Sequence, residues 1–147
     1  MKVYLAIKYH ADHANRARIE GITAVIEALG HKTICVTRDL EQWGAVSYTP
    51  DVLMARSFDA INACGIMVVD LTEKGVGVGI EAGYAYAREM PIITIAQADA
   101  PLSTTLRGIS MEVFSYSDYN DLTEYFIMAL PAAGLDRHNV KPDEGLT

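Results

Sequence analysis

The stretch IMVVDLTEKGVGVGIEAGYAYA, residues 66 to 87, contains the strand-to-helix transition that decides the fold. Its first five residues are a continuous apolar run ending on Asp70, which is typical of a strand buried on both faces of a sheet. Residues 71–74 form a polar connection, and the glycine-rich segment after it predicts a helix through about Glu89. A strand followed at once by a helix is half of a parallel β/α unit.

The same alternation continues on both sides of this stretch. Continuous apolar runs predict strands at residues 3–7, 33–36, 66–70, 91–96 and 112–116. The helix before the second strand carries Ile19, Ile22, Ile26 and Leu29 and is closed by Gly30. The next helix has Thr49 as N-cap with Pro50 at its first position, and it ends near Cys64. Ser117 or Asp118 caps the last helix.

Strands alternating with helices predict an α/β fold. We expect a three-layer αβα sandwich around a five-stranded parallel sheet, flavodoxin- or Rossmann-like, with strand order 2-1-3-4-5. A single domain then spans residues 1–130, and residues 131–147 form a polar C-terminal tail. Ligands of such sheets bind beyond the carboxyl ends of the strands, which selects the loops at residues 8–13, 71–81 and 97–108.

The composition of the chain excludes several classes of binding partner. The formal net charge is -7 with a pI near 4.9, and Lys and Arg form no cluster, so no nucleic-acid-binding surface is expected. No apolar run is long enough to cross a bilayer, which argues against a membrane role. Cys35 and Cys64 lie in apolar stretches and the start of the chain does not resemble a signal peptide, which predicts a cytoplasmic protein. A small molecule is the expected ligand.

Residues 77–82, GVGIEA, also fit the dinucleotide fingerprint, and Asp99 lies about twenty residues further on, where a ribose-binding acid belongs. Against NAD binding, the motif follows the third strand rather than the first. Glu81 would also bring a negative charge to the end of the helix where phosphates dock. We therefore rank NAD binding below a second interpretation and expect no cofactor.

In that second interpretation, Glu81 is the functional group. In the first turn of a helix, unpaired N–H groups and the macrodipole favour a carboxylate, so we expect Glu81 to stay ionised. Such an anion is suited to attack an electrophilic sugar carbon. Gly77 and Gly79 would give a ligand access to the backbone, and Gly83 would permit close packing of the helix on the sheet. Taken alone, Glu81 is more commonly an acid that stabilises its own helix start.

The segments GVGVGIEAGYAYA, IMVVD and MPIITI together resemble the nucleoside 2-deoxyribosyltransferase family, including its 2'-deoxynucleoside 5'-monophosphate N-glycosidases. The resemblance implies that Glu81 is the nucleophile that takes the deoxyribosyl group from the base. It implies that Tyr4, in the segment VYLA, orients this nucleophile. It also implies that Ser103, in PLSTTLRG, reaches the phosphate site of a neighbouring subunit, and hence a homodimer or higher homo-oligomer.

The sequence departs from the family pattern at three places. An ungapped alignment puts Ser57 where the family has an aspartate that serves the leaving base, and Asp59 is the nearest acid. Asp59 takes that role only if the helix shifts in register, because two positions along a helix change its face. Gly75 replaces a family aspartate or serine, and the glycine-rich phosphate loop after the first strand is replaced by KYHADH, which offers Lys8 and His10.

A few further side chains are candidates for binding a metal ion or a base. His10, His13 and Asp12 form no complete ligand set, so no metal is expected, and Asp12 is explained as a helix N-cap. Trp43 and Tyr48 stack on a base or cover the core.

The sequence thus predicts an enzyme that cleaves the N-glycosidic bond of 2'-deoxynucleosides and transfers the deoxyribosyl group, through a Glu81 glycosyl-enzyme, to another base or to water. A 2'-deoxynucleoside 5'-monophosphate N-glycosidase and a non-catalytic nucleotide-binding module are the alternatives. The predicted catalytic residues are Glu81, Tyr4 and Asp59. The predicted substrate-binding residues are Lys8, His10, Gly75, Gly77, Gly79 and Ser103.

Overall fold

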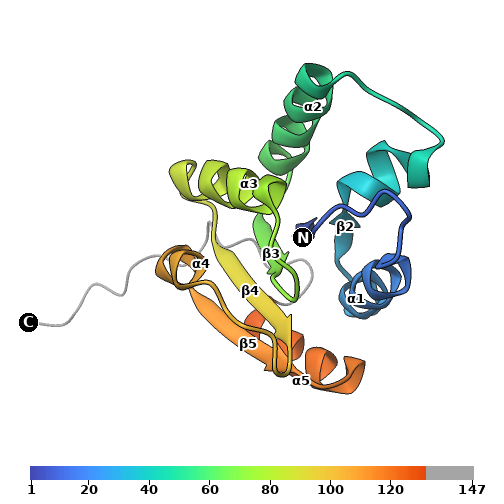
Figure 1. The fold of residues 1–147 in the computed structure, drawn as a ribbon. Helices are drawn as coiled ribbons and strands as arrows, with labels where there is room; N and C mark the ends of the chain where they lie inside the picture. Colours follow the sequence, from blue (N-terminus) through green and yellow to red (C-terminus); the bar gives the residue numbers. More distant parts are fainter. Residues whose placement is uncertain (132–147) are drawn as a thin grey trace, which may run out of the picture.

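Five parallel strands form the centre of the computed structural model, which describes residues 1–131 (Figure 1). The strands are β1 (Lys2–Ala6), β2 (Lys32–Ile34), β3 (Ile66–Asp70), β4 (Ile92–Gln97) and β5 (Glu112–Tyr116). Their order is β2-β1-β3-β4-β5, and every neighbouring pair is parallel. The predicted fold class and strand order are confirmed. The predicted tail lies, beyond Pro131, outside the described residues.

Helices cover both faces of this sheet (Figure 1). The helices are α1 (Arg16–Ala28), α2 (Pro50–Asn62), α3 (Val76–Ala87), α4 (Thr104–Ile109) and α5 (Tyr119–Ala129), with a π-helix η1 (Val36–Leu40) and a 3₁₀ turn η2 (Gln42–Gly44). The apolar sides of α1 and α5 pack on one face, and those of α2, α3 and α4 pack on the other. No helix in residues 1–131 has the length and apolar character needed to span a membrane.

The pleat of β1 decides which helices its side chains meet. Val3 and Leu5 belong to the core beneath α1 and α5, whereas Tyr4 and Ala6 belong to the core beneath α2, α3 and α4. Side chains along a strand point alternately to opposite faces, so this division is a direct consequence of the register. Tyr4 therefore lies, fully buried, in the layer that contains α3.

The structure differs from the prediction at several boundaries. The second strand ends at Ile34, because Val36 begins the π-helix η1. The segment predicted as a loop at residues 97–108 contains α4, whose six residues are too short for a periodic apolar pattern. Asp12 is not the N-cap of α1, since Asn15 precedes that helix and Asp12 Oδ1 instead accepts a hydrogen bond from the Ala14 N–H at 3.1 Å.

The capping box of α5 provides a test of the fold. Asp118 Oδ1 accepts from the Asp121 N–H at 2.9 Å, and Asp121 Oδ2 accepts from the Asp118 N–H at 3.3 Å. We expect Asp118→Ala to lower the free energy of unfolding by about 1 kcal/mol in urea titrations, because a helix N–H loses its partner. Asp118→Ser, which keeps a capping oxygen, is the control. An alanine variant as stable as the wild type would contradict the assignment.

Candidate functional site

A cavity of about 460 Å³ opens where β1, β2 and β3 end. Its wall is built from the residues after β1, the segment after β2, one side of α2 and the start of α3. The lining residues are Ile7, Lys8, Tyr9, Val36, Thr37, Glu41, Leu53, Met54, Ser57, Gly75, Val76, Gly77, Val78 and Glu81. The strand order reverses between β1 and β3, and ligands of open α/β sheets bind at such a point. Of the three predicted loops, two reach this cavity, but residues 97–108 do not.

Glu81, which lines this cavity, contacts the buried Tyr4. The Tyr4 hydroxyl donates a hydrogen bond of 2.9 Å to Glu81 Oε1, so β1 and α3 are joined at the site. Tyr4 is fully buried, and burial together with the neighbouring carboxylate raises its pKa, so its hydroxyl keeps its proton and acts as a donor. Within residues 1–131 no hydrogen bond is made to Glu81 Oε2. One carboxylate oxygen is thus held while the group faces the cavity.

The prediction that Glu81 stays ionised because it lies in the first helical turn is wrong. α3 begins at Val76, so Glu81 is its sixth residue and lies beyond the N–H groups that a helix start leaves unpaired. Burial raises the pKa of Glu81 from 4.5 to about 7, although the hydrogen bond from Tyr4 opposes the shift. Desolvation therefore outweighs hydrogen bonding at this carboxyl group, and its protonation changes near neutral pH.

The glycines of the motif divide between two sides of α3. Gly75 and Gly77 line the cavity, as predicted for substrate-binding positions, but Gly79 does not. A Cβ atom at Gly79 or Gly83 would meet nothing within 4 Å, so Gly83 does not permit close helix-sheet packing. Ala82 and Ala85 face the core instead. Gly77 and Gly79 lie inside the helix, not in the turn before it, which removes the geometry that a dinucleotide fingerprint requires.

Asp59 does not reach the cavity. It lies on the exposed side of α2, whereas Ser57 is buried and lines the cavity wall. The Ser57 hydroxyl donates to the Leu53 carbonyl oxygen at 2.8 Å, an ordinary bond within the helix. The register shift that would exchange these residues is absent, because α2 is regular from Pro50 to Asn62. The structure therefore separates Asp59 from Glu81.

Lys8 and His10, the predicted substrate-binding cations, gather around Glu73. Lys8 Nζ lies 3.8 Å and His10 Nε2 lies 2.9 Å from Glu73 Oε2. Arg18 completes the group, with its guanidinium 2.7 Å from Glu73 Oε1, and this hydrogen bond lowers the pKa of Glu73. Lys8 also lines the cavity, whereas His10 does not. Only Lys8 of the predicted pair is thus available to a ligand beside Glu81.

Ser103 caps α4 and lies outside the cavity. Its hydroxyl oxygen accepts from the Leu106 N–H at 3.5 Å and lies 2.7 Å from Thr105 Oγ1. The role that the resemblance implies for Ser103, in a second subunit, remains a prediction. Among the described residues no cluster of three or more His, Cys, Asp and Glu side chains is arranged to hold a metal ion.

Sequence reasoning missed the wall that follows β2. Val36, Thr37 and Glu41 line the cavity, and burial raises the pKa of Glu41. The rule that ligands bind beside the reversal of strand order would have pointed to this connection, because β2 is the neighbour of β1.

Comparison with known sequences and structures agrees with this arrangement. No family model matches the chain. A protein of Thermofilum pendens named "Putative 2'-deoxynucleoside 5'-phosphate N-hydrolase 1" is 26% identical over 145 residues, covering 90% of this chain and 97% of its own length.

Two solved structures share the fold. A CMP N-glycosidase of Clostridium botulinum superposes with a TM-score of 0.63 at 22% identity, over 88% of this chain and 100% of its own. A 2-deoxyribosyltransferase of Bacillus psychrosaccharolyticus gives a TM-score of 0.69 at 15% identity, over 90% of this chain and 97% of its own. The resemblance to the nucleoside 2-deoxyribosyltransferase family predicted from the sequence is confirmed.

The raised pKa of Glu81 generates a prediction about stability. The folded-state pKa, about 7, lies above the ordinary 4.5, so the folded state binds the proton more tightly than the unfolded chain. The contribution of protonated Glu81 to the free energy of unfolding is fully present below pH 4.5 and is lost as the pH rises through about 7. Glutamine imitates the protonated form. We therefore expect Glu81→Gln to match the wild type near pH 4.5 and to be more stable at pH 8, by about 3 kcal/mol.

Urea titrations of both proteins at the two pH values measure this difference. Glu20→Gln, which changes an exposed acid on α1, is the control and should show no such pH dependence. A Glu81→Gln variant with equal stability at pH 8 would contradict the burial of this charge.

Proposed function

We propose that this chain is an enzyme that cleaves the N-glycosidic bond of a 2'-deoxynucleoside or its 5'-monophosphate, with Glu81 as nucleophile. The observation that carries the proposal is the carboxylate of Glu81, held at 2.9 Å by the Tyr4 hydroxyl and facing a cavity of about 460 Å³. Deoxyribosyl transfer and N-glycosidic hydrolysis are the activities named for its relatives.

The chemistry follows from the environment of Glu81. When ionised, its free oxygen attacks the anomeric carbon of the deoxyribosyl group, and the bond to the base breaks with both electrons leaving on the base. Tyr4 donates to the other oxygen, so it limits rotation of the carboxylate and lowers the pKa of Glu81 against the effect of burial. A second base or water then attacks the glycosyl-enzyme and releases Glu81.

The 5'-monophosphate is the better supported substrate class of the two. The sequence relative carries the name of a 5'-phosphate N-hydrolase. Lys8 is the cation among the lining residues of the described chain, and its Nζ, 3.8 Å from Glu73 Oε2, would exchange this ion pair for a phosphate bound beside Gly75. Water is then the acceptor in place of a second base.

Two further features belong to the same proposal. Ser103 serves a neighbouring copy in a homo-oligomer, as the family resemblance implies, and its position outside the cavity of its own chain is compatible with that role. The protein acts in the cytoplasm, a proposal with which the two free cysteines, Cys35 and Cys64, agree.

Substitution of Glu81 tests the function. We expect Glu81→Gln and Glu81→Ala to abolish release of the base from deoxynucleosides and their monophosphates, because no other group forms the glycosyl-enzyme. Chromatography of reactions with and without an acceptor base measures the release and distinguishes transfer from hydrolysis. Turnover that persists in both variants would remove the mechanism. Calorimetric binding without turnover by the wild type would favour a non-catalytic module.

The pH dependence of the reaction tests the role of Tyr4. Because Glu81 must be ionised, kcat/KM should rise with pH up to about 7 and then level off on this side of the profile. Tyr4→Phe removes the hydrogen bond that lowers the pKa of Glu81, so the rise should move to higher pH. Tyr125→Phe, which removes a hydroxyl bonded to Glu112, is the control. An unmoved profile in Tyr4→Phe would contradict the positioning role.

A further inference from the structure

The cavity contains a second carboxyl group that the family resemblance does not assign. Among its lining residues, within the described part of the chain, Glu41 and Glu81 are the acidic side chains. Ser57, which an ungapped alignment puts where the resemblance implies an aspartate, lines the cavity, whereas Asp59 lies outside it. The acid that a leaving base requires is therefore missing from α2, while an acid is present after β2.

We propose that Glu41 donates the proton to the departing base. The inference rests on the proposed function, because it assigns the leaving-group side of the same reaction. Glu41 and Glu81 come from two different walls of one cavity, after β2 and on α3. Two carboxyl groups, one attacking carbon and the other protonating the leaving group, are the usual arrangement for glycosidic cleavage with a covalent intermediate.

The backbone on both sides of Glu41 adopts conformations that are energetically unfavourable and uncommon in proteins. The π-helix η1, from Val36 to Leu40, immediately precedes it, and such turns are rare and frequent at functional sites. Gln42 and Trp43 follow with φ of 48° and 55°, and Gly44 with 90°. Left-handed conformations at non-glycine residues persist only where surrounding contacts impose them, and they concentrate at active sites.

Contacts of this kind hold the residues that follow Glu41 in the sequence. The Glu41 carbonyl oxygen accepts from the N–H groups of Gly44 and Val46, both at 3.0 Å. The Trp43 ring is covered by the Arg16 guanidinium at 4.4 Å. The edge of His13 meets the same ring at 5.8 Å. Trp43 thus packs on α1 and is not free to stack on a base, which corrects one of its two predicted roles.

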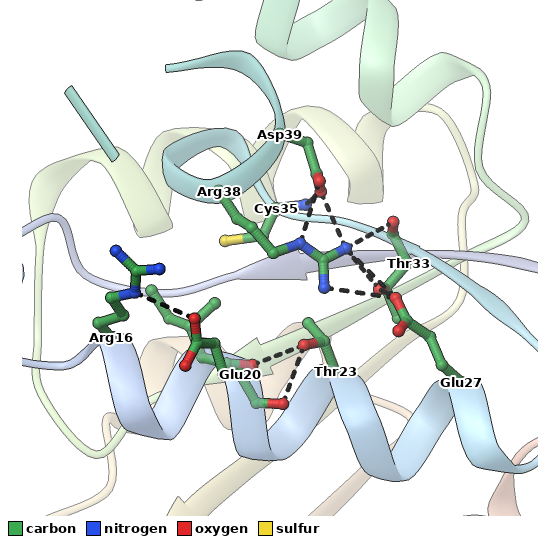
Figure 2. Close-up of polar contacts among 9 residues, drawn as sticks. Arg16, Glu20, Thr23, Glu27, Thr33, Cys35, Arg38 and Asp39 are labelled. Carbon is green, nitrogen blue, oxygen red and sulfur yellow. Dashed lines mark hydrogen bonds and ion pairs between the residues drawn. The ribbon is translucent and has the colours of Figure 1, made fainter. Parts of the chain in front are cut away.

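The chain before Glu41 is equally restrained (Figure 2). Arg38 binds Glu27 on α1, the Thr33 carbonyl oxygen at 3.1 Å and Asp39 at 3.0 Å. Asp39 Oδ2 accepts in turn from the Cys35 N–H at 2.8 Å. The segment that carries Glu41 is therefore held in place before and after this residue. A proton donor has to be positioned in this way, whereas an acid that only faces solvent does not.

The environment of Glu41 agrees with this role. Partial burial raises its pKa, against a smaller lowering by His13, so it keeps a proton to higher pH than an exposed glutamate. The same cavity is lined by the apolar side chains of Val36, Leu53 and Met54, which are suited to contact the face of a base.

The reaction balances with these two groups. Glu81 forms a bond to the anomeric carbon while the carbon–nitrogen bond breaks, and the proton of Glu41 passes to the base. In the second half, water or an acceptor base gives its proton to the Glu41 carboxylate as it attacks the same carbon. Glu81 leaves as a carboxylate, and both groups return to their first state.

The test compares leaving groups in the variant Glu41→Gln. The substrates are the deoxynucleotide that the wild type cleaves and its ring-halogenated analogues, whose bases leave more readily as anions. We expect kcat to fall by about 10² to 10⁴ for the parent substrate, the usual effect of losing a general acid. The loss should shrink steadily along the halogenated series. Glu81→Gln should remove activity on every member of that series.

Asp59→Asn is the matched control and should behave as the wild type. Circular dichroism and urea titration confirm that each variant is folded. A Glu41→Gln variant with wild-type rates, or one that loses the same factor on every substrate, overturns the assignment of Glu41 while leaving Glu81 in place. A wild type that cleaves no member of the series overturns the proposed function and this inference together.

Discussion

The hydrogen bond from Tyr4 to Glu81 spans 77 residues of sequence and joins the first strand to the third helix. Tyr4 is fully buried and Glu81 is partly buried at the cavity, so loss of the carboxylate would leave the tyrosine hydroxyl without its partner. Burial alone would make Glu81 a neutral acid, and the tyrosine hydroxyl partly restores its acidity. The site depends on this balance, because a nucleophilic carboxylate must be anionic yet poorly solvated.

The sheet makes that bond possible. β1 and β3 are parallel neighbours with Tyr4 opposite Met67, and both side chains face the layer that holds α3. A slip of one residue in β1 would turn Tyr4 toward α1 and α5, where no carboxylate of the site exists. The register that buries Val3 and Leu5 on one face therefore also aims the tyrosine on the other. Core packing and site geometry are specified by the same pattern.

How far the sequence predicts this arrangement varies with the kind of signal. The apolar runs predicted all five strands of the described chain, and the rule on strand ends selected the loop that leads to Glu81, whereas the family resemblance alone pointed to Tyr4. Periodicity could not reveal Glu41, because it lies in a turn-rich connection, where an acidic residue has no repeating apolar neighbours that fix the direction of its side chain.

Two corrected expectations share a cause. The placement of Asp59 in the site rests on its distance along the sequence, and the expected ionisation of Glu81 rests on an assumed helix start, whereas the exact phase of a helix decides which way a side chain faces. An error of one or two residues in a boundary is ordinary for sequence reasoning, and it is enough to change a residue's environment from solvent to cavity.

Two carboxyl groups line one cavity, and burial acts on both. Desolvation raises the pKa of Glu81 against the hydrogen bond from Tyr4, and it raises the pKa of Glu41 against a smaller lowering by His13. The same low dielectric that raises the pKa of Glu81 strengthens its attraction for the positive charge that develops on the sugar. Burial that opposes ionisation of the free enzyme therefore favours the transition state, and a more exposed Glu81 would ionise more readily but catalyse less.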